Sequence, residues 1–328
     1  MYRPLLCSVI IVSYNNFDTT TGPCLDSLAQ SPEDMEIIVV DNNSDSSTKQ
    51  LLTLAGERDS RIRLFFLDEN RGYAAGNNIG ARAASGEFFL LLNTDTLVPP
   101  GTISLFSSLM QQNPDWDMLG PVTNNCGNDQ QIYTTGKTPE EILSQGIHWS
   151  NHSAKLSFQT DRLIFFCVLI RRTLYEELQG LDEDFGLGYY EDTDFVYRAI
   201  KSGKRMMISE KIFVYHQGKG SFSKVSGAVR KLMKKNRKLF KKKHGHGETT
   251  DHWRIKNLQA MERYLKHLNK NTPLAELQYS FSNRQRIAEE LMPNSPLKRF
   301  FYRRNLIRTI ARFKRRINQR QSQDSVTI

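Results

Sequence analysis

The chain has 328 residues, of which 39% are hydrophobic and 24% are charged, and this composition is ordinary for a globular protein with a sizeable core. No apolar run approaches the roughly 18 residues that a membrane-spanning helix needs, so we do not expect an integral membrane protein. The four cysteines, at positions 7, 24, 126 and 167, lack the paired spacing of a disulfide scaffold or a zinc ribbon. We therefore expect a reducing, cytoplasmic location.

The net charge of +10 hides a strong asymmetry along the chain. Residues 1–225 carry 19 Lys and Arg against 28 Asp and Glu, whereas residues 226–328 carry 26 against 7. An acidic body followed by a basic tail suggests two tasks, chemistry in the first part and electrostatic docking in the second. We expect a catalytic domain over residues 1–245 and a basic helical extension over residues 246–328.

The first half of the chain alternates strand-like and helix-like segments. Apolar, β-branched runs predict strands at 8–13, 36–40, 61–67 and 87–92, and helix-compatible segments lie at 23–30, 49–58 and 74–84. The first run could also be the core of a secretory signal, but no small-residue cleavage site follows it. Nearly continuous apolar strands between helices indicate an α/β fold with a mostly parallel central sheet that helices cover on both faces.

Polar clusters follow three of these strands, at 13–15, 41–43 and 93–95. Ligands of such sheets bind at the carboxyl ends of the strands, so the clusters predict a ligand site. Gly72, Gly76 and Gly80 are spaced four apart, which places them on one helix face and favours close packing over a dinucleotide-binding loop.

The second half of the chain is less regular. Residues 113–161 are polar and are expected to be irregular. Strands are predicted at 163–170 and 206–215, and helices at 172–179 and 194–202. From residue 227 onward the sequence predicts helices with basic faces.

Three groups of side chains could carry chemistry. Asp95 ends an apolar strand, where it could cap a helix or bind a divalent cation that also holds a diphosphate. Glu191, Asp192 and Asp194 lie within four residues, and like charges this close raise one another's pKa, as a general base requires. One of them could instead cap a helix, which leaves another for chemistry. A lone histidine at a strand end, such as His216, is more often structural than a ligand.

Taken in order, these clusters resemble the inverting family 2 glycosyltransferases of the GT-A fold, and in particular the rhamnosyltransferase-like bacterial members. The stretches that carry the resemblance are SVIIVSYN (8–15), IVVDNNS (38–44), NRGYAAGNN (70–78), LNTDT (92–96), YEDTD (190–194) and His216. The resemblance covers about residues 5–245, and although each motif alone is weak, the ordered set is specific. It implies a GT-A nucleotide-diphospho-sugar transferase fold and a single inverting displacement on a nucleotide-activated sugar, in bacterial surface polysaccharide or glycan synthesis.

The resemblance also implies roles for individual positions. It implies a donor site formed by Val12, Ser13, Tyr14, Asp41, Asn43, Arg71, Gly72, Asn78, Asn93, Thr94 and Asp95. Asp192 would be the general base, with Cys167, Tyr190 and Glu191 on the acceptor side. Asp95 and His216 would hold a divalent metal, Mg²⁺ or Mn²⁺, on the diphosphate. Asn93 stands where many members have the first acid of an Asp-x-Asp motif, which leaves one fewer charged ligand.

The implied partners are a UDP- or dTDP-linked sugar donor and a saccharide or lipid-linked acceptor. Two other classes of protein remain as alternatives. A sugar-1-phosphate nucleotidylyltransferase would carry a Gly-rich, basic loop after the first strand, but residues 14–18 contain no basic residue. A nucleic-acid-binding protein would account for the basic tail but would leave the catalytic motifs unexplained, so we expect no nucleic acid partner.

The end of the tail has the pattern of an interfacial helix. Residues 298–320 contain ten Lys and Arg and no acid, and Leu306, Ile310, Phe313 and Ile317 form an apolar stripe. This stripe could dock on an anionic membrane at its cytoplasmic face or pack on the catalytic domain. A second stripe, formed by Trp253, Leu258, Met261 and Leu265, is less basic and is expected to pack on protein.

Overall fold

The computed structural model describes residues 6–31, 34–218, 227–245, 252–268 and 272–326. The strands are β1 (Cys7–Ser13), β2 (Met35–Asp41), β3 (Ile62–Phe66), β4 (Phe88–Leu92), β5 (Thr96–Leu97), β6 (Met118–Val122), β7 (Ser157–Thr160), β8 (Cys167–Arg171), β9 (Met206–Phe213) and β10 (Tyr215–His216). The helices are α1 (Thr21–Ala29), α2 (Ser46–Arg58), α3 (Gly72–Ala83), α4 (Thr102–Gln112), α5 (Pro139–His152), α6 (Arg172–Glu177), α7 (Glu191–Lys201), α8 (Gly227–His244), α9 (His252–His267), α10 (Leu274–Glu290) and α11 (Pro296–Val326). Two short 3₁₀ turns are η1 (Phe17–Thr19) and η2 (Glu183–Phe185).

The centre of the molecule is an eight-stranded sheet in the order β3-β2-β1-β4-β8-β6-β9-β7, beside a two-stranded sheet of β5 and β10. Strands β1 to β4 are mutually parallel, whereas β8 runs antiparallel to both of its neighbours and β7 runs antiparallel to β9. The sheet is therefore mostly parallel, as the sequence predicts. The carboxyl ends of β1, β2 and β4 meet at one edge.

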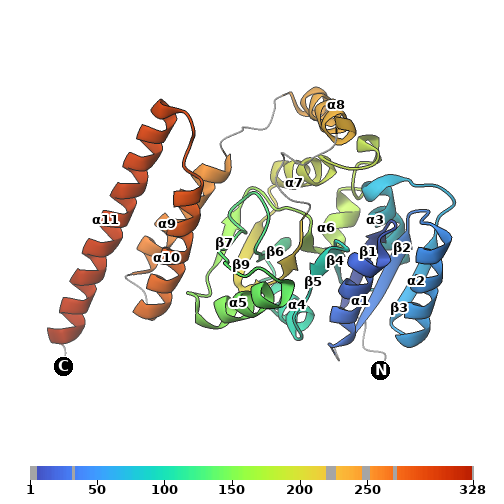
Figure 1. The fold of residues 1–328 in the computed structure, drawn as a ribbon, viewed down its shortest axis with the longest axis horizontal. Coiled ribbons are helices and arrows are strands. Elements are labelled where there is room, and N and C mark those ends of the chain that lie inside the picture. The colour runs from blue at the N-terminus through green and yellow to red at the C-terminus, as the bar shows by residue number, and fades with distance from the viewer. Residues whose placement is uncertain (1–5, 32–33, 219–226, 246–251, 269–271, 327–328) are drawn as a thin grey trace.

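Helices cover both faces of this sheet (Figure 1). Val9 and Ile11 of β1 belong to one core cluster with residues of α1 and α4, whereas Ile10 belongs to a second cluster with residues of α3, α6 and α7. The burial of both faces explains why the strands read as continuous apolar runs rather than alternating ones.

Small residues let α3 lie directly on the sheet. A Cβ added to Gly76 would fall 2.7 Å from Val12, and one added to Gly80 would fall 2.5 Å from Ile10. Their spacing of four residues therefore serves helix–sheet packing, which confirms that prediction.

The structure corrects the second half of the sequence prediction in three places. Residues 113–161 are not irregular, because they contain β6, α5 and β7. The strand predicted at 163–170 begins only at Cys167, and the helix predicted at 194–202 begins at Glu191. Helix α5 has a standard beginning, in which the Thr138 hydroxyl accepts from the Glu141 N–H and Pro139 occupies the first turn.

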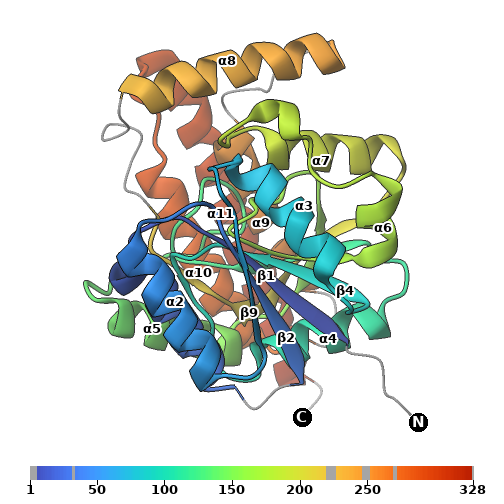
Figure 2. The same ribbon diagram turned by 90° about the vertical axis from the view of Figure 1, so that its right-hand side faces the viewer.

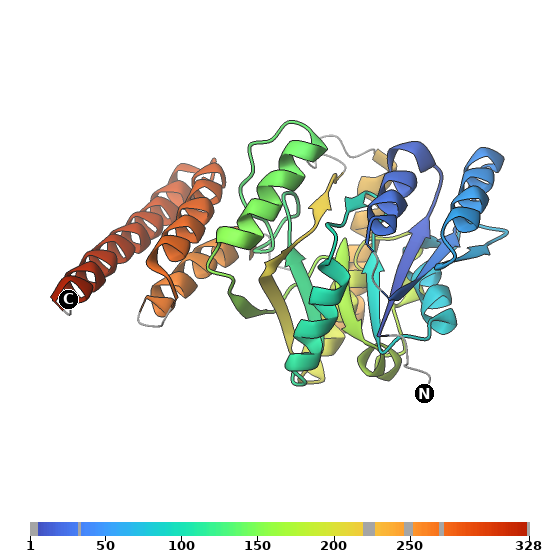
Figure 3. The same ribbon diagram turned by 90° about the horizontal axis from the view of Figure 1, so that it is seen from below.

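Helices α9, α10 and α11 form a group at one end of the sheet and share their own apolar core (Figure 3). Leu306, Phe313 and Ile317 are buried in this core, and the Phe313 ring stacks on Phe281 with 3.7 Å between centroids. The stripe of α11 that was expected to suit a membrane therefore packs on protein, because α9 and α10 supply an apolar partner surface. The stripe of α9 packs on protein as predicted, with Met261 and Leu265 fully buried and Leu258 partly so.

A buried ion pair ties this helical group to the sheet. Arg284 of α10 and Glu210 of β9 are both fully buried, with 3.5 Å between Nη2 and Oε1. Tyr264 of α9 donates a hydrogen bond to the same carboxylate oxygen. None of the helices in the described part of the chain combines the length and apolarity that crossing a bilayer takes.

Candidate active site

The carboxyl ends of β1 and β2 carry the first group of predicted site residues. Ser13 pairs with Asp41 in the strand register, so Tyr14 and Asn42 follow side by side. The Ser13 hydroxyl is buried against the Thr21 hydroxyl at 3.0 Å, whereas the Tyr14 side chain is 51% exposed. Tyr14 therefore offers an open aromatic face at the edge of the sheet where a planar base could stack.

Asp41 is 1% exposed and only half satisfied. Its Oδ2 accepts a hydrogen bond from the Ser44 N–H at 3.1 Å, whereas its buried Oδ1 has no hydrogen-bond partner among the residues that the structure describes. A buried carboxylate oxygen without a donor is costly, so this position suits a hydroxyl or N–H supplied by a ligand.

The segment 70–72 is fixed against the end of β2. The Asn42 amide donates to the Gly72 carbonyl at 3.1 Å and accepts from the Arg71 N–H at 2.8 Å. Gly72 has φ +85°, and a Cβ there would fall 2.1 Å from the Gly186 carbonyl oxygen, so only glycine fits. The half-exposed Arg71 guanidinium lies 3.6 Å from Glu183.

Four other predicted donor residues have differing surroundings. Val12 lies under Gly76, with its side chain against α3. Asn43 is exposed with φ 63°, and its Oδ1 accepts from Lys49 Nζ at 3.3 Å. Asn93 and Thr94 follow β4 directly and are partly exposed, so both side chains border the same edge of the sheet.

Asn78 does not belong to this group. Its amide nitrogen donates to the Leu181 carbonyl at 2.8 Å and to Glu183 Oε1 at 2.9 Å. Its Oδ1 accepts from the Tyr175 hydroxyl at 2.7 Å and from the Leu181 N–H at 2.9 Å. These bonds use both N–H groups and both lone pairs of the amide, so Asn78 joins α3 to the segment after α6. It has no hydrogen-bonding group left to bind a sugar donor.

The small sheet of β5 and β10 brings Asp95 and His216 together. His216 pairs with Thr96, and the Gln217 N–H donates to the Asp95 carbonyl at 2.9 Å. His216 Nε2 lies 3.5 Å from Asp95 Oδ1. Although burial opposes ionisation, the hydrogen bond and charge of His216 hold the pKa of Asp95 below its usual value.

The other ring nitrogen of His216 fixes the tautomer. Nδ1 lies 2.6 Å from the Asn125 carbonyl oxygen, which can only accept, so Nδ1 carries a proton. In the protonated ring Nε2 also carries a proton and donates it towards Asp95. Without that proton the Nε2 lone pair faces the Asp95 carboxylate, and a cation between them would stabilise this second form. Asp95 and His216 therefore fit a divalent metal as two protein ligands.

No cluster of three or more metal-binding side chains occurs within the described ranges of the chain. A metal at Asp95 and His216 would therefore need oxygen ligands from phosphate or water, as hard cations commonly have.

The acidic cluster lies at the beginning of α7. Tyr190 precedes this helix with φ 81°. Glu191 is 6% exposed, and its Oε2 has no hydrogen-bond partner in the described part of the chain. Burial and, after it, the charge of Asp192 raise the pKa of Glu191 to about 8. Burial also raises the pKa of Asp192, although its Oδ1 accepts from the Thr193 N–H at 2.6 Å.

Asp194 is the structural member of the cluster. It lies 2.7 Å from Arg198 and 2.7 Å from His244 of α8, so it is paired on both sides. The sequence alternative that made Asp192 or Asp194 the helix cap is wrong, because the capping position is Tyr190 and both acids lie inside the first turn.

Two phenylalanines join the acidic cluster to the Asp95–His216 pair. The Tyr73 hydroxyl donates to the Phe165 carbonyl at 2.8 Å, and burial together with the charges of Glu191 and Asp192 raises the pKa of Tyr73. The ring of the next residue, Phe166, stacks on His216 with 4.8 Å between centroids. Two consecutive residues, Phe165 and Phe166, thus contact Tyr73 on one side and His216 on the other.

Cys167 was expected on the acceptor side, but the structure places it elsewhere. It is fully buried in the core cluster that includes β1 and β4, and burial raises the pKa of its thiol well above the usual value. Cys167 is buried because it begins β8 and pairs with Leu92 of β4 in the middle of the sheet. Cys167 cannot touch an acceptor.

Helix α8 contributes residues that the sequence analysis missed. It lies across the end of the molecule above α7 (Figure 2). The buried Asn236 amide nitrogen lies 2.7–2.9 Å from the carbonyl oxygens of Phe185, Gly188 and Tyr189. Asn236 and His244 therefore hold the loop that leads into Glu191, but within a Lys-rich helix nothing in the sequence marks them.

Comparisons with known proteins agree with this geometry. The family model described as glycosyl transferase family 2 matches residues 8–179, which is more than half of the chain. The chain is 25% identical over 230 residues to EpsJ of Bacillus subtilis, described as an uncharacterized glycosyltransferase. The alignment covers 67% of this chain and 63% of EpsJ. The chain is also 25% identical over 225 residues to the succinoglycan biosynthesis protein ExoO of Rhizobium meliloti. That alignment covers 66% of this chain and 62% of ExoO. The chain thus spans less than two thirds of the length of these relatives.

A solved structure shares the fold. GalNAc-T7, crystallised with UDP, GalNAc and Mn²⁺, superposes with a TM-score of 0.55 at 15% identity, over 86% of this chain and 55% of that one. At this identity the likeness shows a GT-A fold and no more. With the family model, the motifs and the sheet in agreement, the chain belongs to glycosyl transferase family 2.

Proposed function

We propose that this protein transfers a sugar from a nucleotide-diphosphate donor to an acceptor hydroxyl in a single inverting displacement. The observation that supports it most is the pairing of Asp95 with His216, which the small sheet of β5 and β10 brings within 3.5 Å of each other. Asp95 and His216 would bind a metal that holds the diphosphate, and the Glu191–Asp192 pair would accept the proton of the acceptor.

The nucleotide would lie at the ends of β1 and β2. The exposed ring of Tyr14 would stack on the base, and the unpartnered Asp41 Oδ1 would accept a hydrogen bond from the base or ribose. Ser13 and Asn43 flank these positions, and Arg71 with Gly72 would face the ribose and diphosphate. The donor proposed here is UDP- or dTDP-linked, and GalNAc-T7, which shares the fold, was crystallised with UDP.

Asp95 and His216 would hold a divalent cation, Mg²⁺ or Mn²⁺, with Asn93 and Thr94 beside them. Mn²⁺ in GalNAc-T7 supports this proposal. When bound, the cation would neutralise charge on the departing diphosphate. The Nδ1–H bond from His216 to Asn125 would keep Nε2 directed at the site.

Asp192 would be the general base. The acceptor hydroxyl would lose its proton to the Asp192 carboxylate while its oxygen bonds to the anomeric carbon and the bond to the diphosphate breaks. Glu191 and Tyr190 would border the acceptor, and the charge shared by Glu191 and Asp192 favours proton uptake. We propose a saccharide or lipid-linked acceptor in surface polysaccharide synthesis; the succinoglycan biosynthesis protein ExoO, to which the chain is similar, supports the polysaccharide part of this proposal.

The test is a panel of UDP-, dTDP- and GDP-linked sugars, with release of nucleoside diphosphate measured with and without Mn²⁺. We expect hydrolysis of at least one donor that Mn²⁺ accelerates, and a higher Mn²⁺ requirement in Asp95→Asn and His216→Gln. The matched control is Asp45→Asn, which changes an exposed acid that caps α2. Two results would contradict the metal assignment. One is release that chelator does not slow, and the other is a Mn²⁺ requirement that is the same in Asp95→Asn, His216→Gln and the control.

We further propose that the chain consists of a catalytic domain (1–245) and a basic helical extension (246–328) with different tasks. The extension would dock on the cytoplasmic face of an anionic membrane. The supporting surface is the exposed apolar face of α11, formed by Leu297, Phe300, Phe301 and Ile307, which are 47–68% exposed. It lies opposite the buried stripe. Residues 298 to 320 contain ten basic side chains, of which Arg312, Arg316 and Arg320 bond to Glu262, Leu265 and Leu268 and so do not face a membrane. Each of the other basic side chains near an anionic surface contributes about 1 kcal/mol.

Flotation with vesicles tests this surface. The full chain should float with vesicles containing phosphatidylglycerol at low salt and much less with phosphatidylcholine alone. The Phe300→Ser/Phe301→Ser variant should lose most of this binding, whereas the control Leu54→Ser/Phe66→Ser changes two exposed residues of the catalytic part and should keep it. Equal flotation of both variants would refute the proposal, as would retention on DNA without any vesicle binding.

A further inference from the structure

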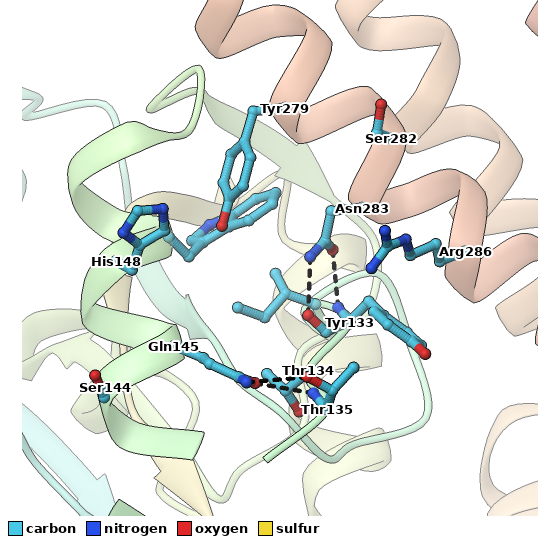
Figure 4. Close-up of a pocket in the computed structure, with 12 residues that line it drawn as sticks. Tyr133, Thr134, Thr135, Ser144, Gln145, His148, Tyr279, Ser282, Asn283 and Arg286 are labelled. Carbon is cyan, nitrogen blue, oxygen red and sulfur yellow. Dashed lines mark hydrogen bonds between the residues drawn. The ribbon is translucent and has the colours of Figure 1, made fainter. Parts of the chain in front are cut away.

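A pocket of about 410 Å³ lies where the catalytic part meets the C-terminal helices (Figure 4). One wall is α5, the opposite wall is α10, and residues 132–135 close the end. None of the residues proposed above for donor, metal or base lines it.

Aromatic rings form one side of the pocket. The Tyr279 ring lies 5.6 Å from Trp149 and 5.7 Å from His148, measured between centroids. Trp149 is 0% exposed, and its indole Nε1–H has no acceptor within the described residues. The exposed aromatic surface of this wall is therefore supplied by Tyr279 and His148, with Trp149 packed behind them.

Two side-chain amides on the other walls are held in place by backbone bonds. Gln145 accepts from the Thr135 N–H at 2.8 Å and donates to the Thr135 hydroxyl at 3.0 Å. Asn283 accepts from the Tyr133 N–H and donates to the Tyr133 carbonyl, both at 2.8 Å. Each amide nitrogen carries two N–H groups, and these bonds use one on each, so a preoriented donor remains on both walls.

The charge of the lining restricts the ligand. Of the described residues that line the pocket, none is Asp or Glu, and Arg286 supplies a cation whose guanidinium lies 5.5 Å from the Tyr133 ring centroid. Such a lining does not suit a metal ion or an amine. Aromatic faces next to fixed amide and hydroxyl donors suit a polyhydroxylated ring, and Arg286 additionally suits a carboxylate on it.

We propose that this pocket binds a sugar unit of the acceptor at a distance from the unit that receives the transferred sugar. The proposal rests on the proposed glycosyl transfer. The same segment connects the two places: Asn124 and Asn125 bond to His216 and Gln217, and nine residues later Tyr133 lines the pocket. Nine residues span at most about 32 Å, so an acceptor of several sugars could reach both places.

Saturation-transfer NMR on the full chain tests the pocket with cellotetraose, mannotetraose and tetragalacturonate as probes. We expect at least one probe to bind, with a loss of at least fivefold in affinity in Tyr279→Ala and in Ser282→Trp. The first variant removes a ring, and the second adds a bulky ring at the exposed rim of the pocket, where it would obstruct entry. Tyr279→Phe retains the ring and should retain binding.

UDP binding, measured on the same samples, separates this proposal from the proposed function. It should be unchanged in all three variants, which also shows that they are folded. Binding of no probe, or equal binding by wild type, Tyr279→Ala and Ser282→Trp, would overturn the pocket proposal. Probe binding that depends on Tyr279 in a protein that binds no nucleotide would retain the pocket and refute the donor site instead.

Discussion

Glu191 is the residue whose surroundings are hardest to reconcile with a purely structural role. Its carboxylate is buried, one oxygen has no partner among the described residues, and Asp192 adds like charge. Desolvation of this kind costs free energy of folding unless the group keeps a proton. A carboxylate whose pKa is raised towards neutral pH is also a better proton acceptor, which suits proton transfer from a hydroxyl.

The raised pKa makes stability depend on pH in a definite direction. Folded Glu191 keeps its proton up to about pH 8, whereas an unfolded glutamate loses it near 4.5. The folded state therefore binds more protons between these values, and its stability falls as pH rises through this range. We expect the melting temperature to drop between pH 6 and pH 8.5 by several degrees, and Glu191→Gln to remove much of that drop. Parallel curves for both proteins would contradict this.

Asp192→Asn tests the proposed base without changing size. We expect transfer to fall by about 100-fold or more, because a general base typically contributes 10²–10⁴-fold. Donor affinity should stay within threefold of wild type, since the base acts mainly in the transition state. Titration with UDP and a transfer assay measure the two quantities. Transfer above a tenth of the wild-type rate would exclude Asp192 as the base.

At the scale of elements, the contact between α3 and β1 is a sensitive one. A Cβ at Gly80 would lie 2.5 Å from the buried Ile10 side chain, so Gly80→Ala should cost about 1–3 kcal/mol despite the better helix propensity of alanine. Gly127→Ala is the control, because nothing lies within 4 Å of its added Cβ. Urea unfolding measures both, and a neutral Gly80→Ala would show that α3 can move away from the sheet.

The sequence predicts β1 to β4 and their intervening helices well, because strands buried on both faces leave continuous apolar runs that turn residues interrupt. It fails for β6 and α5. β6 has only five residues and includes Gly120 and Pro121, and α5 carries a polar sequence whose buried side rests on Gly146 and Trp149. Burial at such places is decided by tertiary packing, which local pattern does not record.

The same limit applies to the candidate site. Asp41, Asp95 and His216 follow strands, so position along the chain indicates where they meet. Asn78 and Cys167 also lie in motif segments but face the interior: Asn78 bonds from α3 to the segment after α6, and Cys167 is the first residue of β8 and is buried. Asn236 comes from a distant helix, so only the folded chain shows that it reaches the loop before Glu191.

At the scale of the molecule, α8 links the basic end of the chain to the catalytic loop. Asn236→Ala would leave the carbonyls of Phe185, Gly188 and Tyr189 without this donor. We expect a loss of about 1–3 kcal/mol in stability and at least a tenfold loss in transfer rate, with UDP affinity unchanged. Asn305→Ala, at an exposed position of α11, is the control. An equal effect of both substitutions on rate would show that α8 does not position the loop.

The buried contact of Arg284 with Glu210 has a consequence for how the protein melts. If α10 detached first, Glu210 of β9 would lose Arg284 as its partner. Burial already raises the pKa of Glu210, and Arg284 and Tyr264 are the groups that oppose this rise. Losing one partner of such a pair costs about 3–5 kcal/mol. The helical group and the sheet should therefore unfold in one cooperative calorimetric transition, with a van't Hoff enthalpy close to the calorimetric one. Two resolved transitions would mean that the C-terminal helices form an autonomous unit held to the sheet by its surface alone.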